Sequence, residues 1–255
     1  MIFLMEVALG LIIFLFGASV GSFCSAYIYR SQKGISIAKG RSICPSCGRQ
    51  IKGYDLIPVI SFIILEGRCR FCNARIPWES FITEILCGLT AIALFRFYYL
   101  TPKGLVLFFV LAVLLCVFLI DLRTMEIPNE LPIALLGLGV VDVLFSTDIS
   151  LLDRGIGLII ISVPMFLLTL VIKNAFGGGD IKLIAAAGFL LGWPGVVFAT
   201  FVGLIVGGVQ GIYILVIKKQ GKDTLFAFGP ALSIGIAVSL IFGQTIINWY
   251  VNLIV

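Results

Sequence analysis

Long apolar segments separated by short polar ones constrain the fold of this chain most. The first apolar segment runs from residue 2 to residue 29 and is interrupted only by Glu6. A bilayer crossing needs about 20 consecutive apolar residues, whereas a helix on the surface of a soluble protein is apolar on one face only. The whole chain is 60% hydrophobic and 12% charged, whereas soluble domains carry about 25% charged residues. The composition therefore excludes a soluble globular enzyme, a disordered chain and a secreted disulfide scaffold.

The apolar pattern predicts an all-α polytopic membrane protein with about eight transmembrane helices. The expected spans are residues 2–29, 79–100, 105–120, 131–145, 155–172, 183–191, 196–217 and 228–255. The segment 183–191 is short for a full crossing, so a tilted or re-entrant course stays open. We expect three parts: a first transmembrane helix over 1–29, a loop over 30–78, and a multi-helix membrane domain over 79–255.

Basic residues are concentrated in the 30–78 loop, and this asymmetry predicts the orientation of the protein. The loop holds nine of the 18 lysines and arginines, and short loops rich in these residues stay in the cytoplasm. If the spans then alternate, the segments 121–130, 173–182 and 218–223 are also cytoplasmic, and both termini lie outside. Because membrane insertion explains the basic loop, no nucleic-acid partner is expected.

Four cysteines in this loop predict a metal site. Cys44 and Cys47 form one Cys-x-x-Cys pair, Cys69 and Cys72 form another, and 21 residues separate the pairs. This spacing is typical of a structural zinc ion held by four thiolates, which would staple a loop too small to have its own core. Gly48 and Asn73 follow the pairs, and both tolerate the positive φ of a metal-binding turn. The alternatives are a redox pair or free thiols.

Two aspartates at membrane boundaries are candidate catalytic residues. The chain has no histidine, so other side chains must carry any acid–base chemistry near neutral pH. Asp121 directly follows a 16-residue apolar run, and two crossings separate it from Asp180, which places both at the same membrane face. The alternatives are a solvated Asp121 and a helix-capping Asp180. The preceding glycines 177–179 offer a side-chain-free backbone to an extended substrate, or else form a hinge or a packing contact.

Several separated motifs resemble those of one family. Gly177-Gly178-Gly179-Asp180 matches the GxGD motif of intramembrane aspartyl proteases. Asp121 with Ile127-Pro128 resembles the other aspartate motif of type IV prepilin peptidases. The segments 17–30, 54–61 and 67–69, and Glu84 with Gly88, are also similar to that family. The resemblance covers nearly the whole chain, with the motifs in the same order.

The resemblance implies an activity, cofactors and a location. It implies cleavage of the short basic leader of type IV prepilins and pseudopilins after a glycine. It further implies N-methylation of the exposed residue with S-adenosyl-L-methionine. Asp121 and Asp180 would form the catalytic dyad, the four cysteines would bind Zn²⁺, and the active site would face the cytoplasm from the bacterial inner membrane. Asn129 departs from the family, in which many members carry Asp.

Some questions stay open from the sequence. No glycine-rich nucleotide fingerprint places the methyl donor, and Glu84 is a weak candidate for the methyltransferase function because an interhelical hydrogen bond would also explain it. Glu126, Glu130 and Asp55 could attract a basic leader. The alternatives are a peptidase without methyltransferase activity, a transporter that uses Glu84 and Asp142, and a thiol oxidoreductase. The sequence identifies neither the prepilin nor the oligomeric state.

Overall fold

The computed structural model describes residues 2–36, 40–146, 148–172, 175–213, 216 and 227–254. This part of the chain consists of helices and loops and contains no β-strand, only two isolated β-bridges, which confirms the predicted all-α class. The predicted cytoplasmic segment 218–223 lies outside the described residues, as do Lys39 and Lys173. Contacts divide the chain into two units, Met1–Phe108 and Phe109–Val255.

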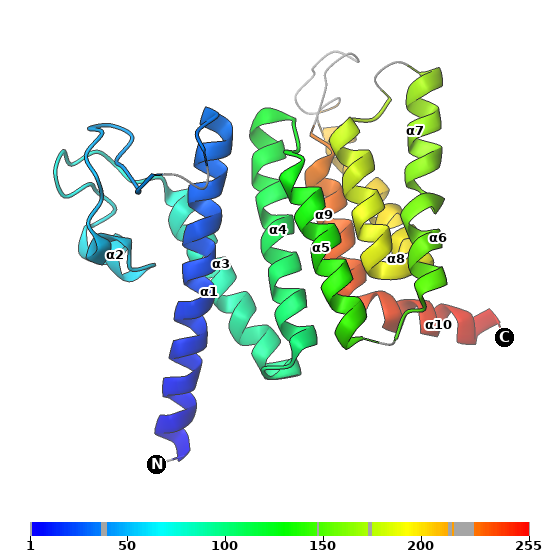
Figure 1. Cartoon of the computed structure of the whole chain (residues 1–255), viewed down its shortest axis with the longest axis horizontal. Helices are drawn as coiled ribbons and strands as arrows, with labels where there is room; N and C mark the ends of the chain where they lie inside the picture. Colours follow the sequence, from blue (N-terminus) through cyan, green and yellow to red (C-terminus); the bar gives the residue numbers. More distant parts are fainter. Residues whose placement is uncertain are drawn as a thin grey trace. The chain divides into compact units, whose positions relative to one another are not determined.

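Two long helices dominate the first unit: α1 (Ile2–Lys33) and α3 (Trp78–Tyr98), which pack against each other (Figure 1). Small residues allow the close approach. A Cβ atom added to Gly17 would lie 2.6 Å from Ala91 Cβ, and one added to Gly21 would lie 2.6 Å from the Thr83 carbonyl oxygen. These contacts show that α1 and α3 run antiparallel.

The loop between these helices contains a 3₁₀ turn, η1 (Gly53–Leu56), and a short helix, α2 (Ile60–Ile64). The ring of Phe62 in α2 stacks on Phe81, with 4.5 Å between the ring centroids, and meets Trp78 edge-on at 5.3 Å. Aromatic pairs at these distances contribute beyond the area they bury. The loop is therefore fixed to the first turn of α3.

The second unit begins within α4 (Pro102–Thr124), whose first residues, up to Phe108, belong to the first unit. The remaining elements are α5 (Glu130–Phe145), α6 (Leu151–Ile160), α7 (Ser162–Val171), α8 (Gly178–Ile212), α9 (Gly229–Val238), the π-helical turn η3 (Ser239–Gly243) and α10 (Gln244–Ile254) (Figure 1).

Helix α8 is a hairpin of two arms rather than one rod. Gly192 breaks it with φ 70° and ψ 172°, which glycine adopts without steric cost. The ring of Phe228 lies 6.3 Å from that of Phe176, just before α8, and 2.8 Å from a Cβ added to Gly207 in the second arm. A straight helix of 35 residues would hold its ends about 50 Å apart. The start and the end of α8 therefore lie at the same end of the unit.

The number of membrane crossings is not fixed by helix length alone. Six helical stretches of the described residues are long and apolar enough to cross a membrane, with α6 and α7 counted as one stretch and α9, η3 and the start of α10 as another. The predicted count of eight is therefore not confirmed. Helix α5 has 16 residues and is about 24 Å long, and the first arm of α8, residues 178–191, is about 21 Å long, against an apolar bilayer thickness of about 30 Å. Both connect the same two ends of the second unit.

A buried ion pair stabilises the end of the second unit at which the first α8 arm finishes. Arg154 is fully buried, and its Nη2 atom lies 2.6 Å from Asp142 Oδ2. Its Nη1 atom donates to the carbonyl oxygens of Phe189 at 3.2 Å and Leu190 at 3.3 Å. These carbonyls belong to the last turn of the first α8 arm, where a cation is favourable. Arg154 thereby joins α5, α6 and α8.

Candidate functional site

The structure brings the two candidate aspartates together at the opposite end of the second unit. Asp121 lies in the last turn of α4 and is 4% exposed. Asp180 lies in the first turn of α8, close enough for the charge of Asp121 to act on it. Nearby, the Nζ of Lys182 donates to Asn129 Oδ1 at 2.7 Å and ties the start of α8 to the start of α5.

The glycines before Asp180 do not form an extended strand. Gly177 alone is extended, with φ −68° and ψ 141°, and α8 begins at Gly178. A Cβ on Gly179 would lie 2.8 Å from Ile127 Cβ, and one on Gly177 would lie 2.9 Å from Asp180 Oδ2, whereas one on Gly178 would meet no atom within 4 Å. Packing against Ile127 thus requires glycine at 179, a Cβ at 177 would displace the Asp180 carboxylate, and Gly178 faces open space.

The start of α9 is a part of this site that the sequence did not indicate. The amide N–H of Gly229 donates to Asp121 Oδ2 at 2.8 Å. A Cβ on Gly229 would lie 2.7 Å from the same oxygen, so only glycine fits here. The positive end of the α9 dipole therefore faces the Asp121 carboxylate. The Gly229-Pro230 pair at the entry of an apolar segment is the only sequence signal for this contact.

This arrangement is suited to acid–base chemistry. Two neighbouring carboxyl groups do not ionise together easily, so that one retains a proton while the other is a base. Glu126 and Glu130 are exposed and belong to the segment that follows α4 at the same end of the unit. They place two exposed carboxylates at this end, beside the exposed Arg123 and Lys182.

The first unit holds the four cysteines as a cluster. Their Sγ atoms all lie within 4.8 Å of one another, and those of Cys44 and Cys72 are 3.8 Å apart. Tetrahedral Zn–S bonds of about 2.3 Å place sulfur atoms about 3.8 Å apart, so the cluster fits a zinc ion. Gly48 and Asn73 have φ values of 67° and 55°, which confirms the positive φ predicted after each pair.

Asp55 has a partner within the same loop. Arg70 donates to both oxygens of Asp55, with the shortest contact 2.6 Å from Nη2 to Oδ1. These hydrogen bonds hold the pKa of the Asp55 carboxyl below its usual range. Asp55 is therefore engaged by Arg70, and the hypothesis that it attracts a leader peptide loses its support.

Glu84 of α3 joins three segments of the first unit. Its Oε2 atom accepts the amide N–H of Val59 at 2.7 Å, and its carboxylate also accepts a hydrogen bond from Ser22 of α1. Val59 has φ 63° and ψ −50°, and Ile60 N donates to Pro58 O at 2.6 Å. This is a γ-turn of the rare, strained form, and for a β-branched residue it is a true outlier.

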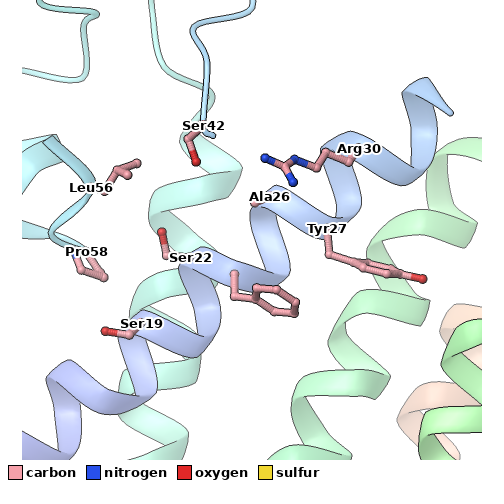
Figure 2. Close-up of a pocket in the computed structure, with 9 residues that line it drawn as sticks. Ser19, Ser22, Ala26, Tyr27, Arg30, Ser42, Leu56 and Pro58 are labelled. Atoms are coloured by element: carbon pink, nitrogen blue, oxygen red, sulfur yellow. The ribbon is translucent and has the colours of Figure 1, made fainter. Parts of the chain in front are cut away.

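A pocket lies next to this turn, between α1 and the loop. Its volume is about 310 Å³. In Figure 2, Ser19, Ser22 and Arg30 point from α1 toward Ser42, Leu56 and Pro58. The remaining lining residues are Phe23, Ala26 and Tyr27.

Comparison with known protein families gives two adjoining matches. Residues 15–98 match the bacterial Peptidase A24 N-terminal domain, and residues 108–212 match the type IV leader peptidase family. The first match lies within the first unit and the second almost entirely within the second unit.

Several similar proteins carry the name prepilin leader peptidase/N-methyltransferase. The protein of that name from Aeromonas hydrophila is 29% identical over 99% of this chain and 99% of its own length. The Bacillus subtilis protein is 30% identical over 95% of this chain and 98% of its own length. The Legionella pneumophila protein is 31% identical over 83% of this chain and 76% of its own length. No solved structure matches.

Proposed function

Because this chain belongs to the type IV leader peptidase family, we propose that it is a membrane aspartyl endopeptidase. It removes the short basic leader of type IV prepilins and pseudopilins and N-methylates the residue exposed by the cut. The observation that carries the peptidase assignment is the meeting of Asp121 and Asp180, 59 positions apart in the sequence. The relatives' names support both activities.

The dyad cleaves the peptide bond with water. The ionised carboxylate takes a proton from water, whose oxygen attacks the scissile carbonyl carbon, and the protonated carboxyl group donates a hydrogen bond to the carbonyl oxygen. The C–N bond then breaks, and the leaving nitrogen receives a proton from the pair. Each aspartate accepts a backbone N–H at a helix start, Asp121 from Gly229 and Asp180 from Gly177. The proton therefore belongs to the pair rather than to one residue.

The substrate approaches the glycines 177–179 at Gly178, whose neighbours Gly177 and Gly179 face Asp180 and Ile127. Gly178 faces open space beside Asp180, so a substrate backbone can come close there. The basic leader meets the exposed Glu126 and Glu130, while the apolar helix that follows the cut lies in the bilayer. Replacement of both glutamates by lysine should raise KM for the prepilin, and unchanged cleavage would exclude this contact.

The orientation follows from the positive-inside rule applied to the basic loop. The dyad faces the cytoplasm from the bacterial inner membrane, and both termini lie outside. Labelling of an engineered cysteine near each end, in a variant that keeps the four clustered cysteines and lacks only Cys24, Cys87 and Cys116, would test this topology. Access to the N-terminal position from the cytoplasm alone would contradict it.

Two bound groups complete the proposal. The four clustered thiolates hold a Zn²⁺ ion that staples the loop and, with four protein ligands, leaves no position for substrate. When bound, S-adenosyl-L-methionine would supply a methyl group from its positively charged sulfur: the S–C bond would break as the new N-terminal amine forms an N–C bond, neutral S-adenosyl-L-homocysteine would leave, and the amine would lose one proton to water. The residues of the chain position the amine and the donor.

The direct test is cleavage of a model prepilin in liposomes by wild type, Asp121→Asn and Asp180→Asn, with product masses recorded. Wild type should remove the leader and add the mass of one methyl group, and each folded variant should be inactive. Normal cleavage by either variant would refute the dyad. Cleavage by wild type without methylation would show a peptidase that lacks methyltransferase activity. Flux of solutes without cleavage would favour a transporter, although Asp142 and Glu84 already have structural partners.

A further inference from the structure

We propose that the pocket between α1 and the four-cysteine loop binds the methyl donor, a zwitterionic sulfonium nucleoside of the S-adenosyl-L-methionine type. This inference rests on the proposed methyl transfer and assigns it a site in the first unit. The pocket volume of about 310 Å³ falls within the range of small-molecule sites, about 300–1,000 Å³.

The polar lining matches the charged end of such a donor. Arg30 provides a guanidinium at the pocket edge and also donates to the Gly40 carbonyl at 3.2 Å. A guanidinium binds a carboxylate through charge-assisted hydrogen bonds. Three hydroxyl groups also face the pocket (Figure 2). Ser19 already donates to the Leu15 carbonyl oxygen at 2.7 Å and Ser22 to the Glu84 carboxylate, so both can accept from an ammonium or ribose group, while Ser42 offers a donor and an acceptor.

A negative charge lies one hydrogen bond behind this lining. Ser22 lines the pocket and also donates to the carboxylate of Glu84. Glu84 is 9% exposed, and weak solvent screening strengthens its attraction for a nearby cation. A sulfonium or ammonium group is therefore stabilised here. A zwitterionic donor satisfies Arg30 with its carboxylate and Glu84 with its cations, whereas a purely anionic lipid headgroup satisfies Arg30 alone.

The apolar wall is set by the strained turn at Val59. Leu56 and Pro58 line the pocket just before this residue, and the contact between Val59 N and Glu84 Oε2 holds the turn in place. Backbone strain persists only where surrounding structure enforces it, and it concentrates at ligand sites. Glu84 is thus a positioning residue for the wall against which an apolar base can pack.

Equilibrium dialysis of labelled S-adenosyl-L-methionine against the purified full chain in zwitterionic detergent tests the site directly. Wild type should bind one equivalent. Arg30→Gln should weaken binding about 10–100-fold, the loss expected for a charge-assisted hydrogen bond, and Ser42→Leu should fill the pocket and abolish binding. Arg41→Gln, which changes an exposed arginine of the same loop outside the pocket, should bind as wild type. All variants should still cleave prepilin.

Other results would refute the donor site, the methyl transfer or the peptidase activity, and each can be told apart. Equal affinity of Arg30→Gln, Ser42→Leu and Arg41→Gln would show that the donor binds elsewhere. A wild type that cleaves but neither binds the donor nor methylates would refute methyl transfer and this site with it, whereas absence of cleavage would refute the proposed peptidase. If native mass spectrometry finds phosphatidylglycerol bound in wild type and lost in Arg30→Gln, with donor affinity unchanged, the pocket is a lipid site instead.

Discussion

Replacement of Gly179 by alanine should damage the catalytic end of the second unit, whereas the same change at Gly178 should not. The added methyl carbon of Gly179→Ala would lie 2.8 Å from Ile127 Cβ and 3.3 Å from the Ile127 carbonyl oxygen. Carbon atoms pack at about 3.5–4.0 Å, so α8 or the segment after α4 must shift by up to about 1 Å. The carboxyl group of Asp180, on the next residue, shifts with it.

The expected losses of thermal stability and of catalytic rate both follow from this displacement. Overpacking of a close contact costs about 1–3 kcal/mol, and each kcal/mol lowers the melting temperature of a chain of this size by about 2–4 °C. A misplacement of about 1 Å at a catalytic group costs about 100-fold in rate. Gly179→Ala should therefore melt several degrees lower and lose most of its kcat.

Gly178→Ala is the matched control because its methyl group would meet no atom within 4 Å. Alanine is favoured over glycine in a helix by up to about 1 kcal/mol, so the melting temperature should be kept or rise slightly. Any loss of activity should appear in KM, since the methyl group would meet only an arriving substrate. Initial cleavage rates at several prepilin concentrations, with thermal unfolding of the same samples, separate the cases. Equal losses of kcat and stability in both variants would refute the packing explanation.

Three further predictions concern groups away from the dyad. Asp142→Asn should lower the free energy of unfolding by about 3–5 kcal/mol because it leaves the charge of Arg154 buried and unpaired. The double variant Asp142→Leu with Arg154→Met should recover most of the lost stability. Equal stability of wild type, the single variant and the double variant would contradict the ion pair. The purified protein should hold one zinc ion per chain by atomic emission, and Cys47→Ser should lose it while its loop becomes sensitive to protease; retention of zinc would exclude the site. Glu84→Gln should reduce methylation more than cleavage, measured on one prepilin sample, because it removes the negative charge and weakens the hydrogen bond that holds the Val59 turn; equal losses would argue against a specific role.

Local sequence patterns predicted the features that depend on neighbouring residues. The Cys-x-x-Cys spacing and the residues after each pair predicted both metal-binding turns, because a turn of a few residues fixes the sulfur positions. The interruption after residue 191 predicted the break of α8, since Gly192 and Pro194 both disfavour a continuous helix. Alternation of the spans predicted that Asp121 and Asp180 share one end of their unit. The number of crossings was less predictable, because neither hydropathy nor helix length decides whether a helix as short as α5 or the first α8 arm crosses the bilayer.

The contacts missed from the sequence each join segments that are distant along the chain and carry no local pattern. Gly229 reaches Asp121 across 108 positions, and it does so because α9 packs beside the second arm of α8, which itself returns only because Gly192 reverses the chain. The positive end of a third helix is thus added to the dyad by the same hairpin that brings Asp180 to it. Hydropathy and motif spacing identify which groups could react. The hairpin decides which backbone amide faces them, and this contact depends on a glycine for which the sequence alone suggested no role.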